Sequence, residues 1–167
     1  MLVYRRDGKI SKTAVLKGKP MEGKIPGVAR HEAVLFSDQF EIRGVLETRP
    51  PRRFLVFLND RFRSILTITE ASIRPLFAEP GGRPLSLPSL VINKSSINLA
   101  WLLKEKKAAA GDFVTIHKVA RPVTVYLGPF VARGQLHAIQ EATLAQSLDA
   151  VIEDFIALTN PSLICLA

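Results

Sequence analysis

Two stretches of the chain alternate between apolar and polar residues. Within residues 40–47 every second residue is apolar or glycine, and the residues between them are mostly charged. Residues 130–136 repeat the pattern, and a glycine, Gly44 or Gly134, takes the same inward position in both stretches. A period of two residues is typical of a β-strand with one buried face. An inward glycine is typical of a sharply bent strand or a close approach of two backbones. We therefore predict two similar, bent strands.

Further β-rich runs flank both strands. Residues 33–36 and 123–127 precede them, separated from them by turns at residues 37–38 and 128–129. After them we expect pairs of β runs joined by a turn, which are residues 64–69 with 71–76 and residues 154–159 with 161–166. Residues 142–152 favour a helix. The pattern does not decide between helix and strand in two segments. Residues 54–58 are compatible with a strand or a short helix, and residues 97–103 with a strand or with part of a helix capped by Ser95 or Ser96.

The strongest signal in the sequence is an internal repeat. Residues 121–167 align with residues 31–77 without a gap when the numbering is shifted by 90. The identical pairs are Phe40 and Phe130, Arg43 and Arg133, Gly44 and Gly134, Leu46 and Leu136, Leu58 and Leu148, Thr69 and Thr159, Ser72 and Ser162, and Leu76 and Leu166. Chance similarity of two amphipathic β segments is the alternative, but the apolar positions also coincide and favour a duplication.

These patterns predict a mainly β fold with short helices, built as two related small β-barrel-like modules. The expected organisation is a basic N-terminal arm in residues 1–30, a first module in 31–101, a linker in 102–111 and a second module in 112–167. Arg43 and Arg133 are expected to point outward, either as solvated strand residues or as anion ligands. The expected core contains Phe36, Phe40, Ile42, Leu46, Leu58, Ile68, Val91, Ile97, Val125, Tyr126, Phe130, Leu136, Leu148, Ile156 and Leu158.

The second copy has no counterpart of residues 90–101 after it. An uncovered strand edge is costly or prone to association. We therefore expect that residues 161–167 are closed by the first module, by residues 2–4 or 13–16, or by another subunit.

Two short motifs carry a resemblance to a known family. Residues 44–46, Gly-Val-Leu, are similar to the Gly-x-Leu of the first Sm motif, and residues 92–97 are similar to the Ile-Arg-Gly-Asn-Asn-Ile of the second. Residues 94–97 are also similar to the Lys-His-Ala-Ile of the bacterial RNA-chaperone branch. Residues 31–101 thus resemble the Sm-like, SH3-like small barrel, which implies five bent antiparallel strands. Pro50 and Phe54 stand where the family has the Asp and Asn of its base pocket. The repeated unit also resembles short, uncharacterised bacterial domains in tandem.

Charge is spread unevenly along the 167 residues, which carry a formal net charge of +8. Residues 1–30 contain eight Lys or Arg against two acidic residues, whereas residues 121–167 contain two against four. A basic arm of this kind either binds a polyanion or is a solvated tail. No apolar run approaches the ~18 residues of a membrane span. The lone Cys165 and the lack of an apolar signal segment favour the cytoplasm.

Catalytic and metal-binding patterns are weak. His31, His117 and His137 lack metal-ligand spacing, and Gly81-Gly82 is not followed by the Lys-Ser/Thr of a phosphate loop. Cys165 lies in an apolar context. We therefore expect neither an enzyme nor a bound cofactor or metal.

We expect a non-catalytic assembly or adaptor protein whose β-sheet edges mediate self-association or docking of another protein. The alternative is sequence-nonspecific binding of RNA or DNA through the arm and an Arg-rich loop. The residues that would contact phosphates in this alternative are Arg5, Arg6, Lys9, Lys12, Arg49, Arg52, Arg53 and Lys94. A third reading, binding to an anionic membrane surface, lacks an amphipathic anchoring helix.

Salt distinguishes the first two readings. A complex held by phosphate contacts is expected to weaken steeply between about 50 and 200 mM salt, because counterions compete for the phosphates. A complex held by apolar strand edges is expected to keep its mass. Light scattering on a sizing column at both salt concentrations, with the ultraviolet absorbance of nucleic acid recorded, measures the difference.

Overall fold

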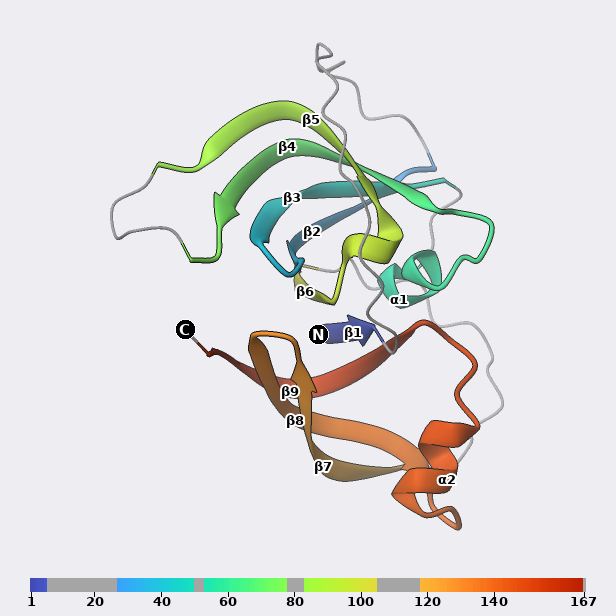
Figure 1. Ribbon diagram of the computed structural model, residues 1–167. Coiled ribbons are helices and arrows are strands. Elements are labelled where there is room, and N and C mark those ends of the chain that lie inside the picture. Colours follow the sequence, from blue (N-terminus) through green and yellow to red (C-terminus); the bar gives the residue numbers. More distant parts are fainter. Residues whose placement is uncertain (6–26, 50–52, 78–82, 105–117, 167) are drawn as a thin grey trace.

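The computed structural model describes residues 1–5, 27–49, 53–77, 83–104 and 118–166. In these ranges the chain is mainly β, as predicted, with one antiparallel sheet of nine strands and two short α-helices (Figure 1). The strands are β1 (Leu2–Arg5), β2 (Ala29–Phe36), β3 (Phe40–Thr48), β4 (Ile65–Pro75), β5 (Leu85–Asn93), β6 (Leu99–Lys104), β7 (Lys118–Leu127), β8 (Phe130–Ile139) and β9 (Phe155–Cys165). The helical elements are α1 (Phe54–Leu58), the 3-10 turn η1 (Lys94–Ser96) and α2 (Leu144–Asp149).

The strand order is β5-β4-β3-β2-β6-β1-β9-β8-β7. Strand β1 lies in the interior of the sheet, where it pairs with β6 on one side and with β9 on the other. Figure 1 shows β2–β6 with α1 on one side of β1, and β7–β9 with α2 on its other side. We call these groups the first half and the second half.

The N-terminal residues close one strand edge from within the chain. Leu2 pairs with Leu158 and Tyr4 with Ile156, so residues 2–4 pair with the first part of β9. The sequence alternative placed residues 2–4 beside residues 161–167, and the β1 ladder does not reach that part of the strand. The later part of β9 pairs with β8. The arm expected in residues 1–30 therefore begins with a buried sheet strand, and the module boundary expected at residue 31 falls inside β2. Residues 13–16 lie outside the described residues.

The two halves pair their strands in the same register. Adding 90 to the residue numbers of the β3–β4 pairs gives the β8–β9 pairs, and both ladders shift directly after the arginine, Arg43 or Arg133. The β2–β3 and β7–β8 ladders obey the same rule, since Ala33 faces Gly44 and Val123 faces Gly134. Residues that match in sequence thus occupy matching places in the sheet.

Backbone contact explains the repeated glycine. A Cβ atom added to Gly44 would overlap Ile68 Cγ2 and lie 2.8 Å from the carbonyl oxygen of Thr69. At Gly134 the corresponding distance to the carbonyl oxygen of Thr159 is 3.0 Å. Both strands therefore bend closely over their neighbour, as the sequence predicted.

The bend continues in β4 and β9. The sequence predicted a turn between two β runs in each copy, which is wrong. Each pair of runs forms a single strand, with one residue in the left-handed region, Glu70 at φ 53° and Asn160 at φ 48°. This conformation, uncommon outside glycine, bends the chain without ending its pairing.

The core forms two clusters of buried apolar residues. The first lies within the first half and also takes in Val3 and Phe155. The second joins the two halves, where the rings of Phe36 and Phe130 meet at 5.2 Å. Fully or largely buried members of the expected core are Phe36, Ile42, Leu46, Leu58, Ile68, Ile97, Phe130, Leu136, Ile156 and Leu158.

Two residues of the expected core are exposed. Phe40, with 37% of its surface exposed, is the first residue of β3 and lies beyond the packed part of the strand. Tyr126, at 73%, alternates with Val125 along β7 and falls on the outer face. Val91, Val125 and Leu148 are half-buried.

The two segments that the sequence pattern left undecided each adopt one of their two alternatives. Residues 54–58 form the helix α1, which buries Phe54, Phe57 and Leu58 against the first cluster. The turn η1 ends at Ser96, and the chain then runs on as the strand β6. Helix α2 begins after Thr143 with a capping box to Gln146, inside the predicted segment 142–152.

We expect the substitution Gly44→Ala to destabilise the fold by about 1–3 kcal/mol, because the new methyl group overfills a closed backbone contact. Gly134→Ala is expected to cost less, since its neighbours are further away. Urea denaturation followed by circular dichroism compares the two variants. Equal midpoints for Gly44→Ala and the native chain would contradict this account of the bend.

Candidate interaction surfaces

Two outer strands each have one neighbour among the described residues. They are β5 at the end of the first half and β7 at the end of the second half. Each contains one proline, Pro88 or Pro122, which removes a backbone donor at that position. The remaining edge positions keep their donors and acceptors, so residues 90–93 and 123–127 are the proline-free stretches that follow Pro88 and Pro122.

The edge of β5 has a counterpart in the interior of the sheet. Strand β4 pairs Ile68 with Leu90, and β9 pairs Leu158 with Leu2. Since Ile68 and Leu158 match after a shift of 90, β1 stands beside β9 as residues 90–93 stand beside β4. The outer side of β1 pairs with β6.

The pairing of β1 with β6 coincides with a difference in burial between residues of β1 and the residues of β5 that match them. Val3 is completely buried beneath the pairing with β6, whereas Val91, in the matching position of β5, is half-buried. Pairing along the β5 edge would cover the apolar side chain of Val91.

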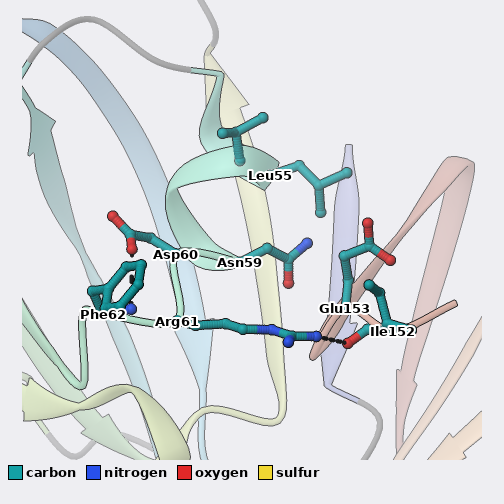
Figure 2. Close-up of a pocket in the computed structure, with 8 residues that line it drawn as sticks. Leu55, Asn59, Asp60, Arg61, Phe62, Ile152 and Glu153 are labelled. Carbon is teal, nitrogen blue, oxygen red and sulfur yellow. Dashed lines mark hydrogen bonds between the residues drawn. The ribbon is translucent and has the colours of Figure 1, made fainter.

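A groove lies beside α1, where the two halves meet (Figure 2). It has a volume of about 610 Å³ and is lined by Leu55, Val56, Asn59, Asp60, Arg61, Phe62, Ile152 and Glu153. The Arg61 guanidinium donates to the carbonyl oxygen of Ile152 at 2.8 Å, which fixes one wall of the groove. These side chains are apolar, singly charged or, for Asn59, neutral and polar, and the lining includes no pair of a nucleophile with a base.

Asn59 joins the halves at the base of this groove. Its Nδ2 donates to the carbonyl oxygen of Phe155 at 2.9 Å, and its Oδ1 accepts from the Phe155 N–H at 2.8 Å. The side chain thus bonds both backbone groups of one β9 residue, whose partner in the β1 ladder is Arg5. Lys94 adds a second link, since its Nζ donates to the carbonyl oxygen of Asp60 at 3.0 Å and lies 3.7 Å from Asp154 Oδ2.

Phe62 is the most exposed apolar residue of this region. Its side chain is fully exposed (102%), and it stands between Arg61 and Arg63. Arg63 packs its guanidinium 5.1 Å from the centre of the Phe57 ring. An exposed aromatic ring between two arginines is a composition found both at protein interfaces and at nucleic-acid stacking sites. Sequence analysis missed Phe62 and Asn59, although the polar run at residues 59–64 marks an exposed turn.

The predicted phosphate-contacting residues do not gather at one described place. Arg49, which follows β3, and Arg53, which directly precedes α1, are both exposed. Lys94 is buried, and its contacts with Asp60 and Asp154 hold its ammonium group within the protein. Arg5 ends β1, while Arg6, Lys9, Lys12 and Arg52 lie outside the described residues. The repeated residues Arg43 and Arg133 are both exposed.

Other chemistry is sparse in the described part of the chain. No group of three or more His, Cys, Asp or Glu is placed there to hold a metal ion. His137 Nε2 lies 2.9 Å from the Thr159 hydroxyl, while His117 lies outside the described residues. Cys165 is exposed. None of the described helices has the length and apolar character needed to cross a membrane.

Comparison with family models, curated proteins and solved structures found no match to this chain.

The substitution Asn59→Ala is expected to lower the free energy of unfolding by about 1–3 kcal/mol, because it leaves a backbone donor and acceptor of Phe155 without their partner. Asn98→Ala, which removes an exposed hydrogen bond to Asp38, is the matched control and is expected to stay within about 0.5 kcal/mol of the native chain. Urea denaturation checks both. Equal losses in the two variants would contradict a joining role for Asn59.

Proposed function

We propose that this chain is two copies of one small β unit and acts as a non-catalytic assembly protein that binds through its sheet edges. The matching registers and the common glycine contact support the duplication. In the first half, β6 follows β5 through η1 and pairs with β2. That connection is the one expected of the SH3-like barrel that the Sm-like resemblance implies.

The pairing of β1 with β6 carries the functional proposal. If the two halves are copies, β1 takes the place of β5 in the second copy, because it lies beside β9 as β5 lies beside β4. This strand pairs on its other side with β6 of the first copy. The contact between the copies is thus an edge-to-edge pairing of strands. The proline-free edge at residues 90–93 is the same element with its outer side open, so we assign it to pairing with a strand of a second copy of this chain.

This contact is heterologous, because it joins two different surfaces. Such contacts generate rings when the rotation between copies closes, and filaments when it does not. The rotation and translation that relate the two halves within one chain would set the geometry of the assembly. Each added molecule would be related to the previous one by that same rotation and translation.

Substitution of Val91 by lysine is expected to block this pairing, since edge lysines oppose the addition of a strand. We expect the native chain to run as a multiple of 18.4 kDa that does not change with salt, and Val91→Lys to run as a monomer. Light scattering on a sizing column measures both masses. Gln135→Lys places the same charge on the exposed face of β8 and is expected to keep the native mass.

A monomeric native chain at every concentration and salt would overturn the assembly proposal. A multimer that persists in Val91→Lys would overturn the assignment of the β5 edge.

A second candidate function, binding of single-stranded nucleic acid, is favoured by the exposed ring of Phe62, which Arg61 and Arg63 flank in the sequence. Base stacking on an aromatic side chain contributes about 1–3 kcal/mol per base, so Phe62→Ala is expected to weaken binding by that amount. Fluorescence anisotropy with a labelled single-stranded RNA at low and high salt measures the change. Phe77→Ala, which removes an exposed ring elsewhere, is the control, and equal affinities for the two variants would exclude the stacking role.

A further inference from the structure

Strand β7 is less covered than its counterpart β2. The inward residues Ala33 and Leu35 of β2 are almost completely buried, whereas Val123 and Val125, which match them after a shift of 90, are half-buried. The difference has a visible cause, because β6 pairs along the far side of β2. Among the described residues no strand stands in that position beside β7.

The N-terminal sequence resembles the segment that contains β6. Residues 2–8, Leu-Val-Tyr-Arg-Arg-Asp-Gly, align with residues 90–96, Leu-Val-Ile-Asn-Lys-Ser-Ser. After one extra residue, Lys9, residues 10–17, Ile-Ser-Lys-Thr-Ala-Val-Leu-Lys, align with residues 97–104, Ile-Asn-Leu-Ala-Trp-Leu-Leu-Lys. The first part of this alignment agrees with the structure, since β1 stands beside β9 as residues 90–93 stand beside β4.

We propose that the open edge of β7 is the binding site of residues 12–17 of the same chain, which would pair with β7 as β6 pairs with β2. These residues lie outside the described residues, and the alignment fixes their register. Leu102 faces Ala33 and Trp101 faces Val34 in the first half. Val15 is therefore assigned opposite Val123, and Ala14 opposite Thr124.

The chemistry of this edge fits that occupant. Val15 would cover the half-buried side chains of Val123 and Val125 from the inner face. Pro122 lacks a backbone donor, but it matches Glu32, the residue at which the β2–β6 ladder shifts. Residues 122–126 match the five β2 residues that pair with β6, and they form the docking edge. Their one proline matches the position at which the β2–β6 ladder shifts its register.

This inference rests on the two-copy arrangement proposed above, and it completes that arrangement. Residues 2–17 would supply the second copy with its last two strands from the opposite end of the chain. The outer edge of the strand formed by residues 12–17 would then pair with the β5 edge of the next molecule in the assembly.

A designed disulfide tests the assigned register. In the full chain with Cys165→Ala, the pair Ala14→Cys and Thr124→Cys is expected to oxidise to an intrachain disulfide, because facing residues of antiparallel strands bring their Cβ atoms to about 4.5–5.5 Å. The pair Ala14→Cys and Ser162→Cys is the control. Ser162 lies two strands further along the same face, since Arg133 stands between Thr124 and Ser162. Non-reducing gel mobility and mass spectrometry after digestion identify the linked residues.

Each outcome bears on the proposal. An intrachain link in the first pair and none in the control supports it. A link between two chains would overturn it in favour of a second copy as the occupant, and no link in either pair would overturn it outright. The light-scattering mass of Val91→Lys is measured on a different edge, so failure of the disulfide and failure of the assembly proposal remain separate results.

A second pair of variants tests the same segment without cysteine. Val15→Asp is expected to lower the urea midpoint, because it would place a charge on the inner face of β7. Leu16→Asp is expected to leave the midpoint unchanged, since it matches Leu103, which is exposed. Unchanged midpoints in both variants would show that residues 12–17 do not pack against β7.

Discussion

Both halves of the sheet hydrogen-bond to the same short strand. Leu2 and Val3 are neighbours in β1, and their side chains point to opposite faces, where they enter the second and the first core cluster. Because a strand pairs on both sides, β1 satisfies the inner edges of β6 and β9 at once. The Asn59 and Lys94 contacts reinforce the same boundary with side chains. The relative placement of the halves therefore depends on residues 2–5, which are far in sequence from β6 and β9, the two strands that they join.

Residues that occupy matching places in the sheet differ in burial where their neighbouring strands differ. Val3 and Val91 match, yet among the described residues Val3 is paired on both sides and Val91 on one. Ala33 and Val123 match as well, and within the same residues a strand lies on the outer side of Ala33 but not of Val123. Differences of this kind reflect neighbours rather than sequence, because exposure depends on what stands beside a strand. They mark places where, among the described residues, a strand has a neighbour on one side only.

Alternation and turn residues predicted much of the fold. Gly44 and Gly134 were recognised because a glycine at an inward position indicates close backbones, and the structure places both against a carbonyl oxygen. Tyr126 was misplaced because adjacent apolar residues do not reveal which one faces inward. The turn expected near Glu70 was wrong because left-handed backbone at a single residue bends a strand without ending it. Phe62 carried no periodic signal, since a residue in a tight turn belongs to neither face of a strand.

The sequence by itself determined the β class, the repeated strands and the inward glycines, because these follow from local alternation and from the space one residue can occupy. Only the tertiary structure decided that β1 stands between the halves, that Asn59 bonds to Phe155, and which strand edges stay open. Those features depend on contacts between residues that lie between 95 and 156 positions apart. Local pattern leaves such pairings undetermined, because several strands of similar composition compete for each edge.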